Sequence, residues 1–389
     1  MSEAAAAVLV VNAGSSSIKA ALDTGDGAPL RAQADLRDHQ TQLTITAAQE
    51  SPRIQPLPAT DGDRWQQAIA ALLDALCGSQ AEPPFAAVGH RIVHGGRFSA
   101  EPVAITPEVR TRLASLAPLA PLHQPHGLAG IEAITQRFPR ILQVACFDTA
   151  FHRTCPDVAR RCALPRSWHD LGIERYGFHG LSYQSIVEQL PGVAGSLPSR
   201  LVIAHLGAGA SMAAVLDGRS IATTMGFTPL DGLVMATRCG SLDPGVVLHL
   251  AEAHGLTAAQ IGELLARESG LLGVSGISGD MQLLLQSDAA EAEEAVELFC
   301  YRAIREVGSL AAALGGLDAL VFTAGIGEHA AIVRQRICTG LRWLGLELDD
   351  EANARHGPRL STAASGVAAW VIATDEAAVI ARATRRALQ

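Results

Sequence analysis

VLVVNAGSSSIKAAL, residues 8–22, is the stretch that decides the fold. Val8–Val11 is apolar, a loop of glycine and serine follows, and Ile18–Leu22 is apolar again. This order predicts two strands joined by a tight turn. The same order returns at LVIAHLGAGASMAAVL, residues 201–216, with a turn at Asp217-Gly218. The chain is therefore expected to contain one structural unit twice.

A third strand is predicted at Ala319–Phe322. It leads into a Gly-rich turn at Thr323–Glu328 and then into a helix over Ala330–Gly340. A strand, a Gly-rich loop and a helix in this order can cradle a phosphate. Further helices are predicted at Asp63–Leu76, Ala289–Leu314 and Glu376–Leu388. Because helices alternate with strands, the sequence predicts an α/β architecture.

The length and the charge of the chain exclude several classes of protein. At 389 residues the chain exceeds the size of most single cores, so two domains with a cleft between them are expected. The 30 basic and 39 acidic residues give a net charge of -9, and they include no basic run. Because nucleic-acid binding depends on clustered positive charge, no nucleic-acid partner is expected.

Two features bear on location. The apolar start, Ala4–Val11, is too short to cross a bilayer and lacks the basic region of a signal peptide. The seven cysteines, at positions 77, 146, 155, 162, 239, 300 and 338, include no C-x-x-C pair. They are interpreted as buried, reduced thiols. A cytoplasmic protein without a membrane partner is therefore expected.

Two segments of the first half could bind an anion. Asn12–Lys19 carries an amide, hydroxyls and a lysine on a tight turn that can hold phosphate or hydrated magnesium. The alternative is an ordinary Gly/Ser hairpin with a solvated lysine, and the segment lacks the spacing of a Walker A loop. Arg91 lies in the apolar run GHRIVHGG, residues 89–96, where its charge needs an anion. That anion is either a bound carboxylate or phosphate, or an internal Asp or Glu.

Arg238 and Asp148 are further candidates. Arg238 ends PLDGLVMATR, residues 229–238, so that a second arginine lies among small and apolar residues and could help to clamp one anion. Asp148 follows the apolar strand Ile141–Val144. It is either a functional carboxylate, as often found at strand ends in α/β enzymes, or a helix N-cap.

Three further residues keep two interpretations each. His179 lies in YGFHG, residues 176–180, where the glycines would let a ligand approach, but a lone histidine is often only structural. The same holds for His123. Glu376 ends TDE, residues 374–376, and this pair of acids at a helix start either faces magnesium or caps the helix.

Taken together, nine segments resemble the acetate kinase family, which belongs to the superfamily of actin, hexokinase and chaperone ATPases. The segments are VNAGSSSIK (11–19), HRIVHGG (90–96), FDTAFH (147–152), RYGFHG (175–180), HLGAGAS (205–211), MGFTPLDGL (225–233), SGLLGVSGISGD (269–280), FTAGIGE (322–328) and TDE (374–376). The resemblance implies an α/β fold of two duplicated ribonuclease H-like (actin-like ATPase) domains around a central cleft. The N-terminal domain would cover residues 1–149 and be completed by the helix at about 376–389. The C-terminal domain, 150–375, would carry the nucleotide-binding loops and the interface of a homodimer, to which Ala289–Leu314 could contribute an apolar helix unless that helix is core.

The resemblance also implies an activity: reversible, magnesium-dependent transfer of a phosphoryl group from ATP to acetate, giving acetyl phosphate and ADP by direct in-line transfer. Manganese could replace magnesium. Arg91 and Arg238 would hold the acceptor carboxylate and the transferring phosphoryl, and His179 would donate to its equatorial oxygens. Asp148 would be the essential carboxylate near the reacting groups.

The remaining site residues follow from the same resemblance. Asn12 and Glu376 would approach magnesium, and Lys19 would face the nucleotide phosphates. The acceptor pocket would be lined by Val93, Leu122, His123, Phe178 and Pro229, and its bulk would favour acetate or propionate over longer acids. The nucleotide would contact three segments: His205, Leu206, Gly207, Ala208 and Gly209; Asp280, Met281 and Gln282; and Gly325, Ile326, Gly327, Glu328 and His329.

On the donor side the chain departs from the family pattern. Ala208, Gln282 and His329 stand where the family has Asn, Arg and Asn, and these changes predict weaker nucleotide binding or a different donor. Smaller departures are Gln124, Gly127, Leu181, Tyr183 and Ala222.

Three other functions are compatible with parts of this pattern. A propionate or butyrate kinase would share every catalytic residue, and a non-catalytic nucleotide-binding regulator would explain the donor-loop changes. A sugar kinase would need polar residues in place of the apolar acceptor lining.

Overall fold

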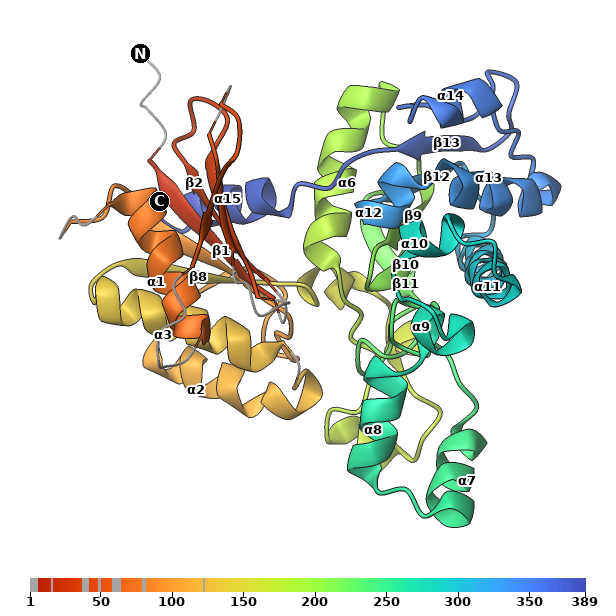
Figure 1. Ribbon diagram of the computed structural model, residues 1–389, viewed down its shortest axis with the longest axis horizontal. Helices are drawn as coiled ribbons and strands as arrows, with labels where there is room; N and C mark the ends of the chain where they lie inside the picture. The colour runs from red at the N-terminus through yellow and green to blue at the C-terminus, as the bar shows by residue number, and fades with distance from the viewer. Residues whose placement is uncertain are drawn as a thin grey trace. The chain divides into compact units, whose positions relative to one another are not determined.

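The computed structural model describes residues 6–14, 17–36, 42–47, 50–57, 64–78, 82–121 and 123–389. The chain forms two compact units. The N-terminal unit is Met1–Ala150 together with Asp375–Gln389, and the C-terminal unit is Phe151–Thr374. Each unit is built on its own β-sheet (Figure 1).

The sheet of the N-terminal unit has the strand order β5-β4-β3-β2-β1-β6-β8-β7. Its strands are β1 (Val8–Ala13), β2 (Ser17–Asp23), β3 (Leu30–Asp35), β4 (Gln42–Thr46), β5 (Arg53–Pro56), β6 (Ala87–Ile92), β7 (Val103–Ala104) and β8 (Leu142–Phe147). The helices of this unit are α1 (Arg64–Cys77), α2 (Pro107–Ser115), α3 (Gln124–Arg137) and α15 (Glu376–Arg386), with the 3-10 helix η1 (Ala117–Leu119).

The sheet of the C-terminal unit has the order β11-β10-β9-β12-β13. Its strands are β9 (Arg200–Leu206), β10 (Ala210–Leu216), β11 (Arg219–Thr223), β12 (Ala319–Thr323) and β13 (Ala368–Val371). The first helices along the chain are η2 (Ala150–Thr154), α4 (Asp157–Arg160), α5 (Arg166–Asp170), α6 (Gly180–Ala194), α7 (Pro244–His254), α8 (Ala258–Arg267) and α9 (Gly270–Ser275). They are followed by α10 (Met281–Leu285), α11 (Ala290–Leu314), α12 (Ala324–His329), α13 (Ala331–Gly340), η3 (Arg342–Leu344) and α14 (Asp350–Ala354).

The two sheets share one topology. In the N-terminal unit, β3-β2-β1 is an antiparallel meander, and β6 and β8 then add in parallel to β1. In the C-terminal unit, β11-β10-β9 is the same meander, and β12 and β13 add in parallel to β9. The prediction that the chain contains one unit twice is therefore confirmed.

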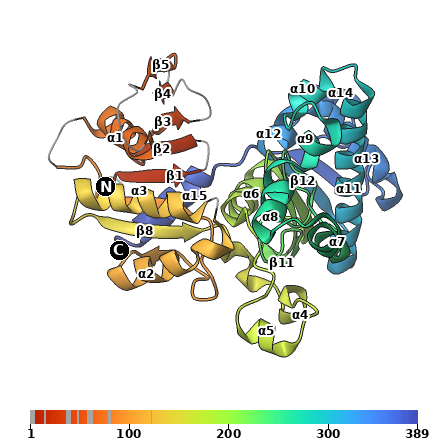
Figure 2. The same cartoon turned by 60° about the horizontal axis from the view of Figure 1, so that its bottom comes forward.

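In the N-terminal unit, helices cover both faces of the sheet. Leu9, Val11 and Val88 pack into one core with residues of α1 and α3. Because side chains alternate along a strand, Gly89 points to the other face, against α15. In Figure 2, α3 lies in front of the strands of this sheet and α15 lies behind them. A Cβ on Gly89 would lie 2.2 Å from the Thr384 Oγ1 of α15. The absence of a side chain here lets the last helix of the chain lie against a central strand.

In the C-terminal unit, α6 supplies Tyr183 and Ile186 to a core that includes Ile203 of β9 and Val215 of β10. The neighbouring residue Val202 is also fully buried. Since it points away from α6, the other face of the sheet is covered by α11, which contacts β9 and β10. The apolar stripe of α11 therefore belongs to the core of the unit.

The predicted helices largely match the observed ones, as α11, α13 and α15 begin within one residue of the expected positions. The start expected at Asp63 lies outside the described residues. The Gly-rich turn expected at Thr323–Glu328 is instead the short helix α12. Ala324 adopts a left-handed φ of 65°, which turns the chain directly from β12 into this helix.

All seven cysteines are free thiols. Cys162 and Cys239 are only partly buried, so the prediction of buried thiols is wrong for these two. In the part of the chain that the structure describes, no helix is both long enough and apolar enough to cross a membrane.

Candidate functional site

Parallel strands bring three predicted residues to one edge of the N-terminal sheet. Asn12, Arg91 and Asp148 lie at or just after the carboxyl ends of β1, β6 and β8. These three strands are parallel neighbours, so their carboxyl ends meet at the same edge. Arg91 pairs in register with Cys146, and Asp148 lies two residues further along on the same face.

Arg91 and Asp148 form a forked ion pair. The Arg91 Nη2 donates to Asp148 Oδ2 at 2.6 Å, and the Arg91 Nε lies 3.1 Å from Oδ1 and 3.0 Å from Oδ2. Asp148 is 1% exposed, and the side chain of Arg91 is 21% exposed. The interpretation of Arg91 as a member of an internal ion pair is therefore correct in this structure, and Asp148 is not a helix N-cap. Such a fork also leaves the guanidinium in a fixed orientation.

Two further oxygen atoms border this guanidinium. Arg91 Nη1 donates to Asn12 Oδ1 at 3.3 Å, and Glu376 Oε2, in the first turn of α15, lies 3.7 Å from Arg91 Nε. Asp375, not Glu376, is the cap of this helix, because its carboxylate accepts the Ala378 N–H. Lys19 is exposed on β2 directly opposite Asn12.

The charges of this cluster act against one another. Burial alone lowers the pKa of Arg91, but Asp148 and Glu376 outweigh that effect and raise it. Burial raises the pKa of Asp148, Arg91 opposes the shift, and the charge of Glu376 adds to it. Two acids next to one arginine therefore leave a surplus of negative charge, which a divalent cation or a second cationic group would offset.

This set of oxygen donors fits magnesium. Mg²⁺ binds through a few carboxylate or amide oxygens and keeps several waters. Asn12, Asp148 and Glu376 supply only oxygens, while the described residues contain no cluster of three His, Cys, Asp or Glu side chains that would form an all-protein metal cage. The residues present therefore suit a metal that is also held by water and by a phosphate.

The predicted acceptor-pocket residues are distributed over both units. Val93 is 9% exposed and follows β6, and His123 immediately precedes α3. Leu122 lies outside the described residues. Phe178 is 1% exposed, and Pro229 accepts a hydrogen bond from Arg238 through its backbone oxygen at 3.1 Å.

Two departures from the family pattern have a structural explanation. Gln124 is buried, accepts the His94 N–H at 3.2 Å and donates to the carbonyl oxygens of His94 and Leu113. A Cβ on Gly127 would lie 3.1 Å from Ile92 Cδ1. Both residues therefore fit closely packed positions around α3.

In the C-terminal unit, His179 and Arg238 approach each other at Gly209. His179 has a left-handed φ of 59° and precedes α6, with its Nδ1 2.8 Å from Ser211 Oγ. A Cβ on Gly209 would lie 3.5 Å from His179 Nε2 and 3.6 Å from Arg238 Nη1. The absence of a side chain at Gly209 therefore keeps open the space beside these two nitrogens.

Arg238 is a cation without an acidic partner. Its contacts are the carbonyl oxygen of Pro229 and the sulfur of Met235, and no carboxylate of the described residues pairs with it. Burial lowers its pKa. A largely buried guanidinium that meets only neutral groups can bind an incoming anion without losing an existing ion pair.

Parallel strands also bring together two of the segments that are predicted to contact the nucleotide. The turn Gly207–Gly209 follows β9, and α12 follows the adjacent parallel strand β12. A Cβ on Gly207 would lie 3.5 Å from the Cβ of Ala324. The predicted segments around Leu206 and Ile326 are therefore neighbours.

The third segment, Asp280–Gln282, begins α10. Asp280 caps this helix by accepting the Gln282 N–H at 2.8 Å. Met281 is buried, whereas Gln282 is exposed. The two other departures on the donor side, Ala208 and His329, are exposed as well.

Sequence reasoning missed Arg334. This fully buried arginine of α13 donates to the carbonyl oxygens of Gly327 and Glu328 at 2.9 and 2.8 Å and to Asn353 Oδ1 at 2.8 Å. The Glu328 carboxylate in turn accepts the Ala324 N–H at 2.8 Å. Arg334 therefore fixes the end of α12. An arginine within an expected helix is common on surfaces, so its burial could not be recognised from the sequence.

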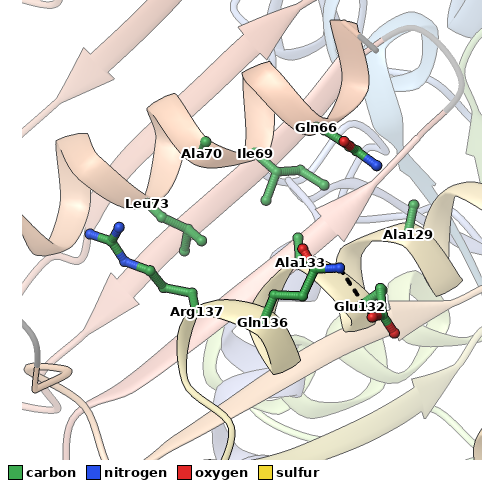
Figure 3. Close-up of a pocket in the computed structure, with 9 residues that line it drawn as sticks. All are labelled: Gln66, Ile69, Ala70, Leu73, Ala129, Glu132, Ala133, Gln136 and Arg137. Atoms are coloured by element: carbon green, nitrogen blue, oxygen red, sulfur yellow. Dashed lines mark hydrogen bonds between the residues drawn. The ribbon is translucent and has the colours of Figure 1, made fainter. Parts of the chain in front are cut away.

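A groove elsewhere in the N-terminal unit contains none of the predicted residues. It has a volume of about 570 Å³ and lies between α1 and α3 (Figure 3). Ile69, Leu73 and Ala133 give it an apolar floor, and Glu132 and Gln136 lie at its polar border.

The sequence matches known proteins over nearly its whole length. Residues 7–382 match the family model described as the acetokinase family. An acetate kinase from Rhodopseudomonas palustris (strain TIE-1) is 53% identical over 386 residues, which are 96% of this chain and 96% of the relative. An acetate kinase from Methylocella silvestris is 45% identical over 390 residues, which are 97% of this chain and 96% of the relative.

Solved structures agree with this match. A propionate kinase from Francisella tularensis superposes with a TM-score of 0.91 at 35% identity, covering 98% of this chain and 99% of that one. An acetate kinase from Porphyromonas gingivalis gives a TM-score of 0.87 at 36% identity, covering 99% and 100%. The predicted fold class of duplicated, actin-like α/β domains is confirmed. By sequence and by fold, the chain belongs to the acetokinase family.

Proposed function

We propose that this enzyme is a phosphotransferase that moves a phosphoryl group reversibly between ATP and acetate. The observation that carries the proposal is the position of Arg238 and His179, which approach each other at Gly209 while Arg238 lacks an acidic partner. The names of the Rhodopseudomonas and Porphyromonas relatives support acetate as the acceptor.

The chemistry asks for cations and hydrogen-bond donors more than for a base. Acetate is already ionised at neutral pH, so no proton has to be removed before it attacks the γ-phosphorus. In-line transfer spreads charge over three equatorial oxygens, and fixed donors stabilise that charge. In the proposal, Arg91 and Arg238 hold the acceptor carboxylate and the transferring phosphoryl, and His179 donates to an equatorial oxygen.

Asp148 acts in this proposal through Arg91 and the metal. The forked contact at 2.6 and 3.0 Å fixes the plane of the guanidinium before the substrate binds. Asn12 and Glu376 hold magnesium, in part through water, and Lys19 faces the nucleotide phosphates. When bound, the metal neutralises charge on the phosphoryl oxygens.

The donor side is proposed to be modified. Ala208 offers a methyl group in place of an amide, and Gln282 and His329 replace an arginine and an asparagine of the family pattern. All three are exposed. ATP is expected to bind more weakly than the family pattern would allow, or another donor to be preferred.

Propionate is the second candidate acceptor. It is favoured by the propionate kinase from Francisella, which is similar to this chain over its whole length. A hydrophobic pocket discriminates by about 1 to 3 kcal/mol per methylene, so both acids can be substrates. The homodimer and the cytoplasmic location remain predictions.

The experiment is a hydroxylamine trap for acyl phosphate. Acetate, propionate and butyrate are each combined with ATP, GTP and pyrophosphate in the presence of magnesium. Acetyl phosphate from ATP, lost in Arg91→Ala and kept in Arg110→Ala, would support the proposal; Arg110 is an exposed arginine of α2 paired with Glu132. Product with another donor only would show a change of donor, and no product with any pair would favour the non-catalytic regulator.

A further inference from the structure

Three side chains of the C-terminal unit form a buried hydrogen-bond chain. Tyr183 Oη lies 2.5 Å from Ser211 Oγ, and Ser211 Oγ lies 2.8 Å from His179 Nδ1. Tyr183 and Ser211 are both 0% exposed. The hydrogen bonds therefore lead from the buried core of the unit to His179, which lies beside Gly209.

The strand register and the helix period bring these residues together. Ser211 of β10 pairs directly with His205 of β9, and both point to the face covered by α6. His179 and Tyr183 are four residues apart at the start of that helix, so they lie one above the other. Tyr183 is one of the departures from the family pattern.

The burial of Tyr183 and Ser211 decides which group donates and which accepts in each of these hydrogen bonds. Tyr183 Oη has no hydrogen-bond partner other than Ser211 among the described residues, and a buried hydroxyl hydrogen without an acceptor is costly. The Tyr183 hydrogen is therefore donated to Ser211 Oγ. Ser211 then donates its own hydrogen to His179 Nδ1, which is the other hydrogen-bond partner of Ser211 Oγ among the described residues. Burial also raises the pKa of Tyr183, so its proton stays in place at any physiological pH.

We infer that Tyr183 and Ser211 are positioning residues that hold His179 as the neutral tautomer with its proton on Nε2. The inference rests on the proposed function for its meaning in the reaction. With Nδ1 accepting from Ser211, Nε2 carries the hydrogen and points to the space beside Gly209, where Arg238 Nη1 also lies. His179 then supplies a neutral N–H to a phosphoryl oxygen.

The other groups that face His179 favour the same neutral state. His205 stacks on it with ring centroids 4.1 Å apart, and the cation of Arg238 approaches the same space at Gly209. A second positive charge between these groups would be repelled by Arg238. Protonation at Nδ1 would also leave the Ser211 hydrogen without an acceptor.

The test reads the tautomer directly. The full-length protein is labelled with 15N-histidine, and the His179 resonances are identified by their loss in His179→Gln. Two-bond 15N–1H correlations then show which ring nitrogen carries the proton. The expected wild-type result is a proton on Nε2, and a proton on Nδ1 would overturn the inference.

Two substitutions interrupt the hydrogen-bond chain at different points. Tyr183→Phe removes the buried donor and Ser211→Ala removes the bridging hydroxyl, and both are expected to give a mixture of the two tautomers. Tyr176→Phe is the matched control, because it removes a buried tyrosine hydroxyl that bonds the Gly172 carbonyl instead. Unchanged spectra in both Tyr183→Phe and Ser211→Ala would overturn the inference.

Activity gives a second, separate readout. Loss of one well-placed neutral donor is worth about one order of magnitude in rate, so kcat for acyl phosphate formation should fall about tenfold in both variants while KM for acetate stays constant. A rise in KM with unchanged kcat would contradict the positioning role. If no donor and acceptor pair reacts at all, the proposed function fails, whereas the tautomer measurement still decides the inference.

Discussion

Two nitrogens of the Arg91 guanidinium donate hydrogen bonds to Asp148 Oδ2: Nη2 at 2.6 Å and Nε at 3.0 Å. Both residues lie at the ends of adjacent parallel strands, so the pair is anchored by backbone hydrogen bonds on either side. Removing one member leaves the other charge in a poorly solvated place.

Asp148→Asn is therefore expected to lower the free energy of unfolding by about 1.5 to 3 kcal/mol, because Arg91 loses its forked partner and keeps only the Glu376 carboxylate, 3.7 Å away. Urea denaturation measures the change. The double variant Asp148→Asn with Arg91→Met should lose less than the sum of the two single variants, since the hydrogen bonds between these two residues can be lost only once. Strict additivity would show that the pair is not coupled.

Gly209→Ala separates activity from stability. The added methyl would make ordinary contacts at 3.5 and 3.6 Å with His179 Nε2 and Arg238 Nη1, so the free energy of unfolding should change by no more than about 0.5 kcal/mol. It would occupy the proposed phosphoryl space, and kcat/KM for acetate should fall at least about tenfold. Gly262→Ala, on α8 with open space around it, is the control and should retain full activity. Equal activity of both variants would place the phosphoryl elsewhere.

Arg334→Lys tests the support of α12. Lysine keeps the charge but loses the fork that reaches Gly327, Glu328 and Asn353 together, so the protein should lose about 3 kcal/mol of stability. The looser helix should raise KM for ATP and leave KM for acetate unchanged. Initial rates with each substrate varied in turn give both constants. Arg355→Lys, an exposed arginine 69% accessible, should alter neither, and equal increases in both KM values would argue against a donor-specific role.

Two of the departures from the family pattern at the predicted nucleotide site can be reversed by mutation. Ala208→Asn and Gln282→Arg restore the polar groups of the family pattern at two exposed positions. Each new hydrogen bond to a nucleotide is worth about 0.5 to 1.5 kcal/mol, so KM for ATP should fall about two- to tenfold. Saturation by ATP that is unchanged in both variants would show that these positions do not limit donor binding.

Acid should destabilise the protein through buried histidines. Burial lowers the pKa of His90, His94 and His152 to about 4, against an ordinary value near 6.5. Between these values the unfolded chain binds more protons than the folded one, so stability falls as the pH drops from about 6.5 to about 4. Each histidine contributes up to about 3 kcal/mol over this window.

His90→Asn should make this decline less steep by about one third, because two of the three histidines remain. Unfolding free energies measured from pH 4 to pH 7 give the slope. His254→Asn, on the surface of α7, is the control and should leave the slope as it was. An identical slope in His90→Asn would mean that other groups control the acid response.

Much of the fold could be predicted because its determinants are local. The hairpins at Val8–Leu22 and 201–216 show their apolar strands and small turns directly in the sequence. The helix α11 shows its period in the same way. The short helix α12 could not be predicted, because its start depends on the φ of Ala324 and on the Glu328 side chain that accepts its N–H.

By itself, the sequence determined the α/β class, the repeated unit, the family and the residue types available for chemistry, since each depends on patterns along the chain. Only the tertiary structure decided how those residues are paired. Whether Arg91 meets a ligand or an internal acid, and whether Tyr183 is mere core or part of a hydrogen-bond chain, depends on strand register and helix placement. Those partners are 57 and 28 residues apart in the chain, and only folding brings them within hydrogen-bond distance.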